Sequence, residues 1–177
     1  MTTTRRLFVG LTPPAPVRDA IVAACAHWAW PPGVALARPD QLHITLAFLG
    51  NVDASRVDAL AQALSAIETP PFTLQLVDHE LWHRGIAVLR PRENDVMNAL
   101  QSSVSDVVAS QGLAAEAHAW KPHLTLARKA AHARPPVAAT TAVSWDVAGF
   151  DLLWSRLPPG VPQPVYEAVA SFGLCAA

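Results

Sequence analysis

Two short stretches of the chain share one pattern. Residues 42–50 read Leu-His-Ile-Thr-Leu-Ala-Phe-Leu-Gly, and residues 122–128 read Pro-His-Leu-Thr-Leu-Ala-Arg. Successive side chains of an extended strand point to opposite faces of a sheet. Each copy is therefore expected to present a histidine and a threonine on one face and apolar side chains on the other. A half-buried strand needs only some polar residue on its wet face, so the same choice at both places indicates a shared function.

The similarity extends beyond the two motifs. The order strand, helix, strand, motif strand describes residues 7–49 and again residues 86–128. With Phe8 and Val88 as centres of the leading strands, 43 − 8 and 123 − 88 both equal 35. Matched length indicates an internal duplication. A pseudo-twofold axis between the repeats is expected to bring the two motif strands face to face across a cleft.

Apolar periodicity predicts three helices, at about residues 17–28, 55–67 and 93–111. Ser55 and Asp58 have the spacing of a capping box for the second helix, and Gly112 is the expected C-terminal cap of the third. Strand 34–38 is expected to pair with strand 43–49. The apolar parity favours a core position for Phe48, with a base-stacking platform as the alternative. The remaining predicted strands are 7–11, 72–77, 85–89, 113–118, 121–128, a hairpin within 143–154, and 165–172.

Length and composition favour one domain, residues 1–177, with a substantial core, because the chain has 177 residues of which 51% are hydrophobic. The formal charge is −1 and only two lysines are present, so we expect no surface that holds long nucleic acid by charge alone. Two cysteines, Cys25 and Cys175, form neither a disulfide framework nor a metal cluster. No apolar run approaches a signal core or a membrane span. The expectation is a cytoplasmic monomer without a membrane segment.

Two histidines on facing strands can supply one general base and one general acid, because both forms of imidazole are populated near pH 7. Displacement at phosphorus needs both, since a nucleophile loses a proton and a leaving oxygen gains one. Threonine hydroxyls on the same face can donate hydrogen bonds to the non-bridging oxygens. Neither a carboxylate cluster nor cysteine-rich spacing accompanies the histidines, so a metal-independent mechanism without a cofactor is favoured.

The two His-x-Thr-x motifs resemble those of the two-histidine (2H) phosphoesterase superfamily. Within it the chain is most similar to the RNA 2′,3′-cyclic phosphodiesterases, also called 2′-5′ RNA ligases, from the strand at Arg6 to the closing strand at Tyr166. The resemblance implies an α+β fold of two pseudo-symmetric lobes, each with an antiparallel sheet and flanking helices around a central cleft.

The resemblance also implies an activity: hydrolysis of a 2′,3′-cyclic phosphate on an RNA 3′ end or a small nucleotide to a 2′-phosphomonoester, with 2′-5′ RNA ligation as a further possibility. It assigns His43 as proton donor to the departing 3′ oxygen and His123 as proton acceptor from water. Thr45 and Thr125 correspond to phosphate ligands, and Arg128 to a bidentate partner of the phosphate.

Arg128 has two interpretations, because strict alternation puts it on the apolar face of its strand with Leu124 and Leu126. Either the strand ends or bulges before Arg128, or the residue serves a structural ion pair.

Two other functions compete with catalysis by the histidine pair. The same fold could hold a nucleotide or RNA end without turnover, although a binder does not require two titrating groups. A metal-dependent hydrolase could use His79, His83 and His118, although the spacing of the first two suits a helix and their segment is predicted as strand and turn. His27 and His132 are expected to be packing or surface residues.

Overall fold

The computed structural model describes residues 3–113, 119–137 and 142–175. Three α-helices occupy these ranges: α1 (Ala15–Cys25), α2 (Val57–Leu64) and α3 (Asp95–Ser110). Two short 3₁₀ helices, Pro39–Gln41 and Ala54–Arg56, precede β3 and α2. The strands are β1 (Thr4–Leu11), β2 (Ala35–Leu36), β3 (Ile44–Asp53), β4 (Phe72–Trp82), β5 (Ile86–Pro91), β6 (Leu124–Arg128), β7 (Val143–Val147), β8 (Gly149–Arg156) and β9 (Val165–Gly173). No helix in the described ranges has the length and apolar character to span a membrane.

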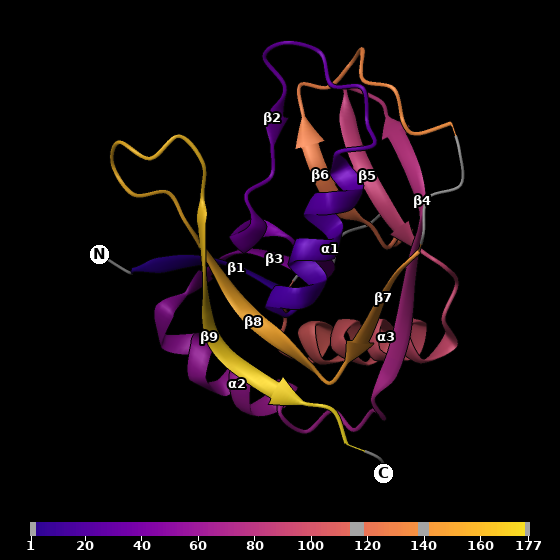
Figure 1. Cartoon of the computed structure of the whole chain (residues 1–177). Coiled ribbons are helices and arrows are strands. Elements are labelled where there is room, and N and C mark those ends of the chain that lie inside the picture. The colour runs from indigo at the N-terminus through magenta and orange to yellow at the C-terminus, as the bar shows by residue number, and fades with distance from the viewer. Residues whose placement is uncertain (1–2, 114–118, 138–141, 176–177) are drawn as a thin grey trace.

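The strands form one curled antiparallel sheet in the order β7-β4-β5-β6-β3-β1-β8-β9, with β2 paired to β6 (Figure 1). Its two halves, β7-β4-β5-β6 and β3-β1-β8-β9, meet at the pair formed by Ile44 of β3 and Leu124 of β6. The predicted α+β fold is therefore confirmed, and the antiparallel sheets expected in two lobes are joined here into one. The two motif strands lie next to each other at the centre.

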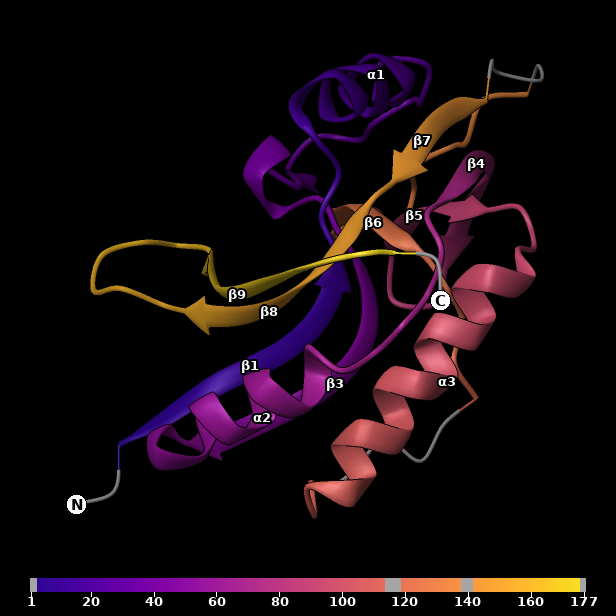
Figure 2. The ribbon, with the colours of Figure 1, turned by 90° about the horizontal axis from the view of Figure 1, so that it is seen from below.

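Two of the three helices cross between the halves. Helix α1 follows β1 of one half but contacts β7 of the other, and α3 follows β5 but contacts β3. Figure 2 shows α2 and α3 beside β1 and β3, with α1 beside β7. Their buried residues, including Ile21, Leu60 and Met97, join one core with apolar side chains of the sheet. We call this side of the sheet the helix face, and the opposite side, which carries Phe8 and Thr45, the histidine face.

Each motif strand contains a β-bulge at its leucine. The register skips Leu46 between the pairs Gly10↔Thr45 and Val9↔Ala47, and it skips Leu126 between Val88↔Thr125 and Ala87↔Ala127. An extra residue in one strand shifts the alternation of the side chains that follow it, and in β3 a second shift at Leu49, between Phe8↔Phe48 and Leu7↔Gly50, restores it. The same irregularity at the same motif position supports the duplication. In this register Val88 of the second repeat corresponds to Gly10 of the first and not to Phe8, because each lies opposite the motif threonine. The distance in sequence from this residue to the threonine is 45 − 10 = 35 in the first repeat and 125 − 88 = 37 in the second. This corrects the equal spacing expected from sequence.

The carbonyl groups at both bulges have partners. The Leu46 carbonyl accepts a hydrogen bond from Gln101 Nε2 of α3 at 3.4 Å. The Leu126 carbonyl accepts one from the Ala37 backbone amide at 2.8 Å. Because an unpaired buried carbonyl is costly, these contacts stabilise the bulges that shape the histidine face.

Several local predictions were wrong because they depended on long-range pairing. Strand β2 pairs with β6 and not with β3. Strands β7 and β8 do not form a hairpin with each other; β7 pairs with β4 and β8 with β1, since the lone Ala148 between them is too short for a two-residue turn. Before α2, the Asp53 carboxylate accepts from the Ser55 amide at 2.9 Å in place of the expected Ser55–Asp58 capping box.

The prediction for the third helix was better. Gly112 follows α3 with φ +64°, as a C-terminal cap requires. Asn94 Oδ1 caps the other end by accepting from the Met97 amide at 2.9 Å. The strand expected at 113–118 lies outside the described residues except for Leu113, which is not in a strand.

Candidate active site

His43 and His123 occupy equivalent places, each directly before the first residue of its strand. The residues that follow them, Ile44 and Leu124, form the pair that joins β3 to β6. Continued by one residue, this antiparallel register sets His43 opposite Thr125 and His123 opposite Thr45. Residues directly opposite in such a ladder share a face with Cβ atoms about 5 Å apart. The fold thus gathers both motifs into one site.

Both imidazoles are held by the same contact. His43 Nδ1 lies 2.6 Å from the Gln41 carbonyl oxygen, and His123 Nδ1 lies 2.7 Å from that of Lys121. A carbonyl only accepts, so Nδ1 carries the hydrogen in each ring. The neutral form of each histidine therefore has its lone pair on Nε2, which can take or give a proton while Nδ1 fixes the ring.

The two threonines are half-buried on the histidine face. Thr45 is opposite Gly10 on β1, and Thr125 is opposite Val88 on β5. A Cβ added at Gly10 would lie 3.0 Å from the Ile44 carbonyl oxygen. Glycine at this position therefore lets β1 approach the start of the first motif strand closely.

The bulge at Leu126 settles the position of Arg128. Ala127 pairs with Ala87, whose neighbour Val88 faces the histidines, so Ala127 lies on the helix face and Arg128 on the histidine face. The side chain is exposed and makes no ion pair with a carboxylate in the described part of the chain. Its guanidinium lies close enough to His43 to lower the pKa of that imidazole. The bulged interpretation is correct, and the structural ion pair is not found.

His43 sits among aromatic rings. The ring centroids of Phe8 and Tyr166 lie 4.9 and 5.1 Å from that of His43. Burial lowers the pKa of His43 below its ordinary value of 6.5, the Gln41 carbonyl opposes that shift, and the charges of His123 and Arg128 lower the pKa further. In the ligand-free protein at neutral pH the uncharged form of His43 therefore predominates.

His123 has a different support. The Trp82 ring lies 4.5 Å from the imidazole, and its indole Nε1 donates to Glu80 Oε2 at 2.6 Å. Arg90 donates to Glu80 Oε1 at 3.2 Å and to the Pro122 carbonyl at 3.3 Å. The Trp82 hydrogen bond, and then Arg90, lower the pKa of Glu80. This network holds the Trp82 ring against His123 and fixes the backbone at Pro122, the residue directly before His123.

Two further side chains hold the backbone of the site. Trp120 Nε1 donates to the Thr45 carbonyl at 2.9 Å, which ties the approach to the second motif to the first. The Gln41 side-chain amide donates to the Pro164 carbonyl at 2.6 Å, close to the start of β9, the strand that carries Tyr166. None of these supporting residues was identified from sequence, because each is recognised only by a contact with a distant segment.

Phe48 is not a core residue, contrary to the sequence prediction. The bulge at Leu46 reverses the parity beyond it, so Phe48 pairs with Phe8 on the histidine face. Phe48 is half-buried, and the Arg6 guanidinium lies 5.0 Å from its ring centroid.

The remaining histidines lie elsewhere. His79 pairs with Leu89 on the helix face, and its Nδ1 accepts a hydrogen bond from Trp28 Nε1 at 2.7 Å. His27 and His132 are exposed. The described residues contain no cluster of three potential metal ligands, and His118 lies outside them.

Comparison with known proteins agrees with this architecture. The family model of the 2′-5′ RNA ligase superfamily matches residues 13–157. An RNA 2′,3′-cyclic phosphodiesterase of Escherichia coli strain K12 is 33% identical over 141 residues, which cover 75% of this chain and 77% of that protein.

Solved structures extend the likeness to nearly the whole chain. A crystal structure of a phosphoesterase aligns with a TM-score of 0.88 at 29% identity and covers 97% of this chain and 99% of its own. The structure of E. coli LigT complexed with NADP⁺ aligns with a TM-score of 0.85 at 28% identity, covering 97% and 98%. Together with the repeated motif and its bulge, these matches place the chain in the 2′-5′ RNA ligase superfamily.

Proposed function

We propose that the protein is an RNA 2′,3′-cyclic phosphodiesterase that works without a metal, through His43 and His123. The observation that carries the proposal is the pair of imidazoles fixed through Nδ1 on adjoining strands, beside a guanidinium with no carboxylate partner among the described residues. The family and the name of the E. coli relative support cyclic phosphodiesterase activity. The substrate would be an RNA 3′ end or a small nucleotide with a 2′,3′-cyclic phosphate.

The chemistry follows from two poised Nε2 atoms. His123 Nε2 accepts a proton from water as the water oxygen bonds to phosphorus, and the bond from phosphorus to the 3′ oxygen breaks. His43 Nε2 donates its proton to that oxygen, which leaves the phosphate on the 2′ oxygen. Thr45, Thr125 and Arg128 bind the non-bridging oxygens and offset their charge.

Ligation would use the same groups. A 5′ hydroxyl in place of water would bond to phosphorus with the same 3′ oxygen departing, so the product would be a 2′-5′ linkage. Whether the protein catalyses this reaction depends on whether a second RNA end can displace water in the site.

The proposed reaction is tested by incubating an oligonucleotide with a 2′,3′-cyclic phosphate end in excess chelator and identifying the product by phosphorus NMR. We expect full activity and a 2′-phosphomonoester. Loss of activity with chelator, restored by a divalent metal, would favour a metal-dependent hydrolase. Binding without any product would leave only the nucleotide-holding function.

The pH dependence should reveal the lowered pKa of His43. A general acid must be protonated, so kcat/KM is expected to fall as pH rises through the free-enzyme pKa of His43, which lies below 6.5. The phosphate of a bound substrate favours the imidazolium, so in kcat this alkaline limb should move to higher pH. Profiles of both constants check the prediction, which fails if kcat/KM only climbs through the alkaline range.

A further inference from the structure

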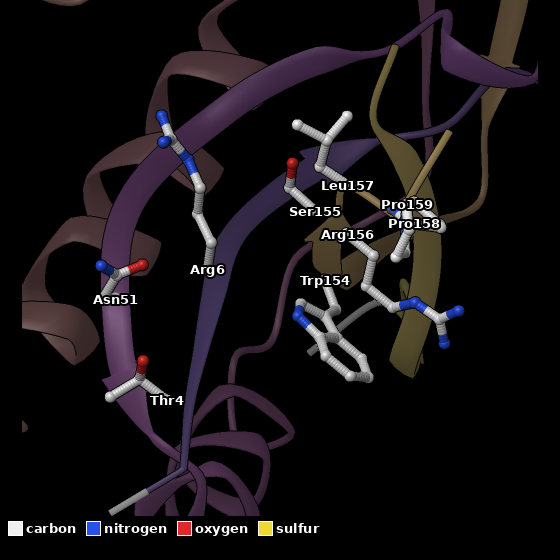
Figure 3. Close-up of a pocket in the computed structure, with 9 residues that line it drawn as sticks. All are labelled: Thr4, Arg6, Asn51, Trp154, Ser155, Arg156, Leu157, Pro158 and Pro159. Atoms are coloured by element: carbon white, nitrogen blue, oxygen red, sulfur yellow. The ribbon is translucent and has the colours of Figure 1, made fainter. Parts of the chain in front are cut away.

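A pocket lies between β1 and the end of β8, beside the β8–β9 strand pair that carries Tyr166. Its volume is about 460 Å³, a size that suits a small organic ligand such as a nucleotide unit. Thr4, Arg6 and Asn51 line it from β1 and β3, and residues 154–159 line it from β8 and the following loop (Figure 3). The strands separate here, because the pairing of β1 with β8 ends at Leu7 and Trp154.

Tyr166 joins this pocket to the active site. The Tyr166 ring lies 5.1 Å from that of His43. Tyr166, on β9, pairs with Ser155 of β8, which lines the pocket. Burial raises the pKa of Tyr166, and the charges of Arg128 and Arg6 both act against that shift. The Tyr166 hydroxyl is therefore within electrostatic reach of the proposed phosphate ligand and of the pocket arginine.

The charge of Arg6 is available to an anionic ligand. Arg156, the other cation of the pocket, is paired with Glu167 at 2.9 Å, whereas Arg6 is exposed and forms no salt bridge within the described residues. The Arg6 guanidinium instead lies over the Phe48 ring at 5.0 Å. A guanidinium stacked on an aromatic ring offers a flat face for a nucleobase together with a charge for a phosphodiester.

We propose that Arg6, Phe48 and the pocket beside them form a second nucleotide subsite, which holds the nucleotide on the 5′ side of the cyclic-phosphate end of a single-stranded RNA. This inference rests on the proposed function. A cyclic mononucleotide reaches only the histidines, Arg128 and the threonines, whereas an RNA chain continues past Tyr166 to Arg6. The subsite thus makes the enzyme prefer RNA ends over small cyclic nucleotides.

The chain supplies a matched control in the preceding residue. Arg5 and Arg6 carry the same charge on the same strand, and each lies over an aromatic ring. However, Arg5 pairs with Val52 and lies over Trp154 at 4.7 Å on the opposite side of β1. Arg5→Gln and Arg6→Gln therefore make the same change of net charge at neighbouring positions, but only the second removes the guanidinium that lies over Phe48; Arg5 contacts a single pocket residue, Trp154, from the other side of β1.

The test compares a short single-stranded RNA ending in a 2′,3′-cyclic phosphate with the cyclic mononucleotide of the same base. We expect Arg6→Gln and Phe48→Leu to lower kcat/KM for the RNA by about 5- to 100-fold, the range for one lost base stack, and to leave the mononucleotide nearly unchanged. Arg5→Gln should alter neither. An equal loss on both substrates for Arg6→Gln, or equal effects of the two arginine variants, would overturn the subsite.

A binding measurement keeps this inference separate from the proposed function. Fluorescence anisotropy of a labelled single-stranded RNA with a 2′-phosphate end reports affinity without turnover. We expect Arg6→Gln to weaken this binding and to reduce the slope of log K against log salt by about 0.7, as for one lost phosphate contact on a single strand. If the RNA binds in this way but is never hydrolysed, the catalytic proposal fails and the subsite stands. If hydrolysis is normal and the slope is unchanged, the subsite fails alone.

Discussion

Replacement of His43 or His123 with alanine is expected to lower kcat by about 10²- to 10⁴-fold, the usual effect of removing a proton-transfer partner. Each imidazole is held by a backbone carbonyl and by aromatic contacts on the histidine face, outside the helix-face core. Both variants should therefore stay folded, and the melting temperature should fall more for His43→Ala, whose imidazole is packed against Phe8 and Tyr166, than for His123→Ala. Steady-state kinetics on a cyclic nucleotide, with thermal unfolding of each variant, measure both effects.

The double variant is the sharper test. Members of one catalytic unit act together, so His43→Ala with His123→Ala should be scarcely slower than the poorer single variant. His132→Ala, which removes an exposed loop imidazole, serves as the control and should be fully active. If the single variants turn over normally and only bind substrate more weakly, the acid-base assignment must be withdrawn.

Replacement of Arg128 with glutamine is expected to lower kcat/KM by about 10- to 100-fold, which corresponds to the loss of a charge-assisted hydrogen bond to phosphate. The same change should move the alkaline limb of the kcat/KM profile to higher pH. Arg128 lowers the pKa of His43, and removing a positive charge favours the imidazolium, so the acid remains protonated further up the pH range.

Two companion variants separate charge from geometry. Arg128→Lys keeps the charge but not the planar fork, so it should retain the wild-type limb while losing part of the rate. Arg134→Gln removes an exposed arginine close by in the chain and should change neither readout. A normal rate and an unshifted limb in Arg128→Gln would show that this guanidinium does not act on the reacting phosphate.

The sequence alone was enough to predict the proposed chemistry of the site. The repeated His and Thr sit at fixed spacing within apolar strands, and a local pattern of this kind can be read without knowing what the strands pair with. The same holds for the Gly112 cap, which depends on the backbone conformation of one residue. The α+β fold class and the family can also be predicted from such local patterns.

Only the tertiary structure decided which face the residues beyond each motif occupy. Phe48 and Arg128 both follow a bulge, and a bulge is defined by two residues of one strand opposing one of its neighbour. Strict alternation therefore assigns both residues to the wrong face, and for Arg128 only the alternative of a bulged strand agrees with the structure.

Long-range contacts decided the rest. Tyr166 and Trp82 reach the histidines from β9 and β4, and nothing in their own segments distinguishes them from other half-buried aromatic residues. Strands β7 and β8 are neighbours in sequence, yet β7 pairs with β4 in one half of the sheet and β8 with β1 in the other. Pairing partners and ring contacts are properties of the assembled chain, since their free energy comes from segments far apart in sequence.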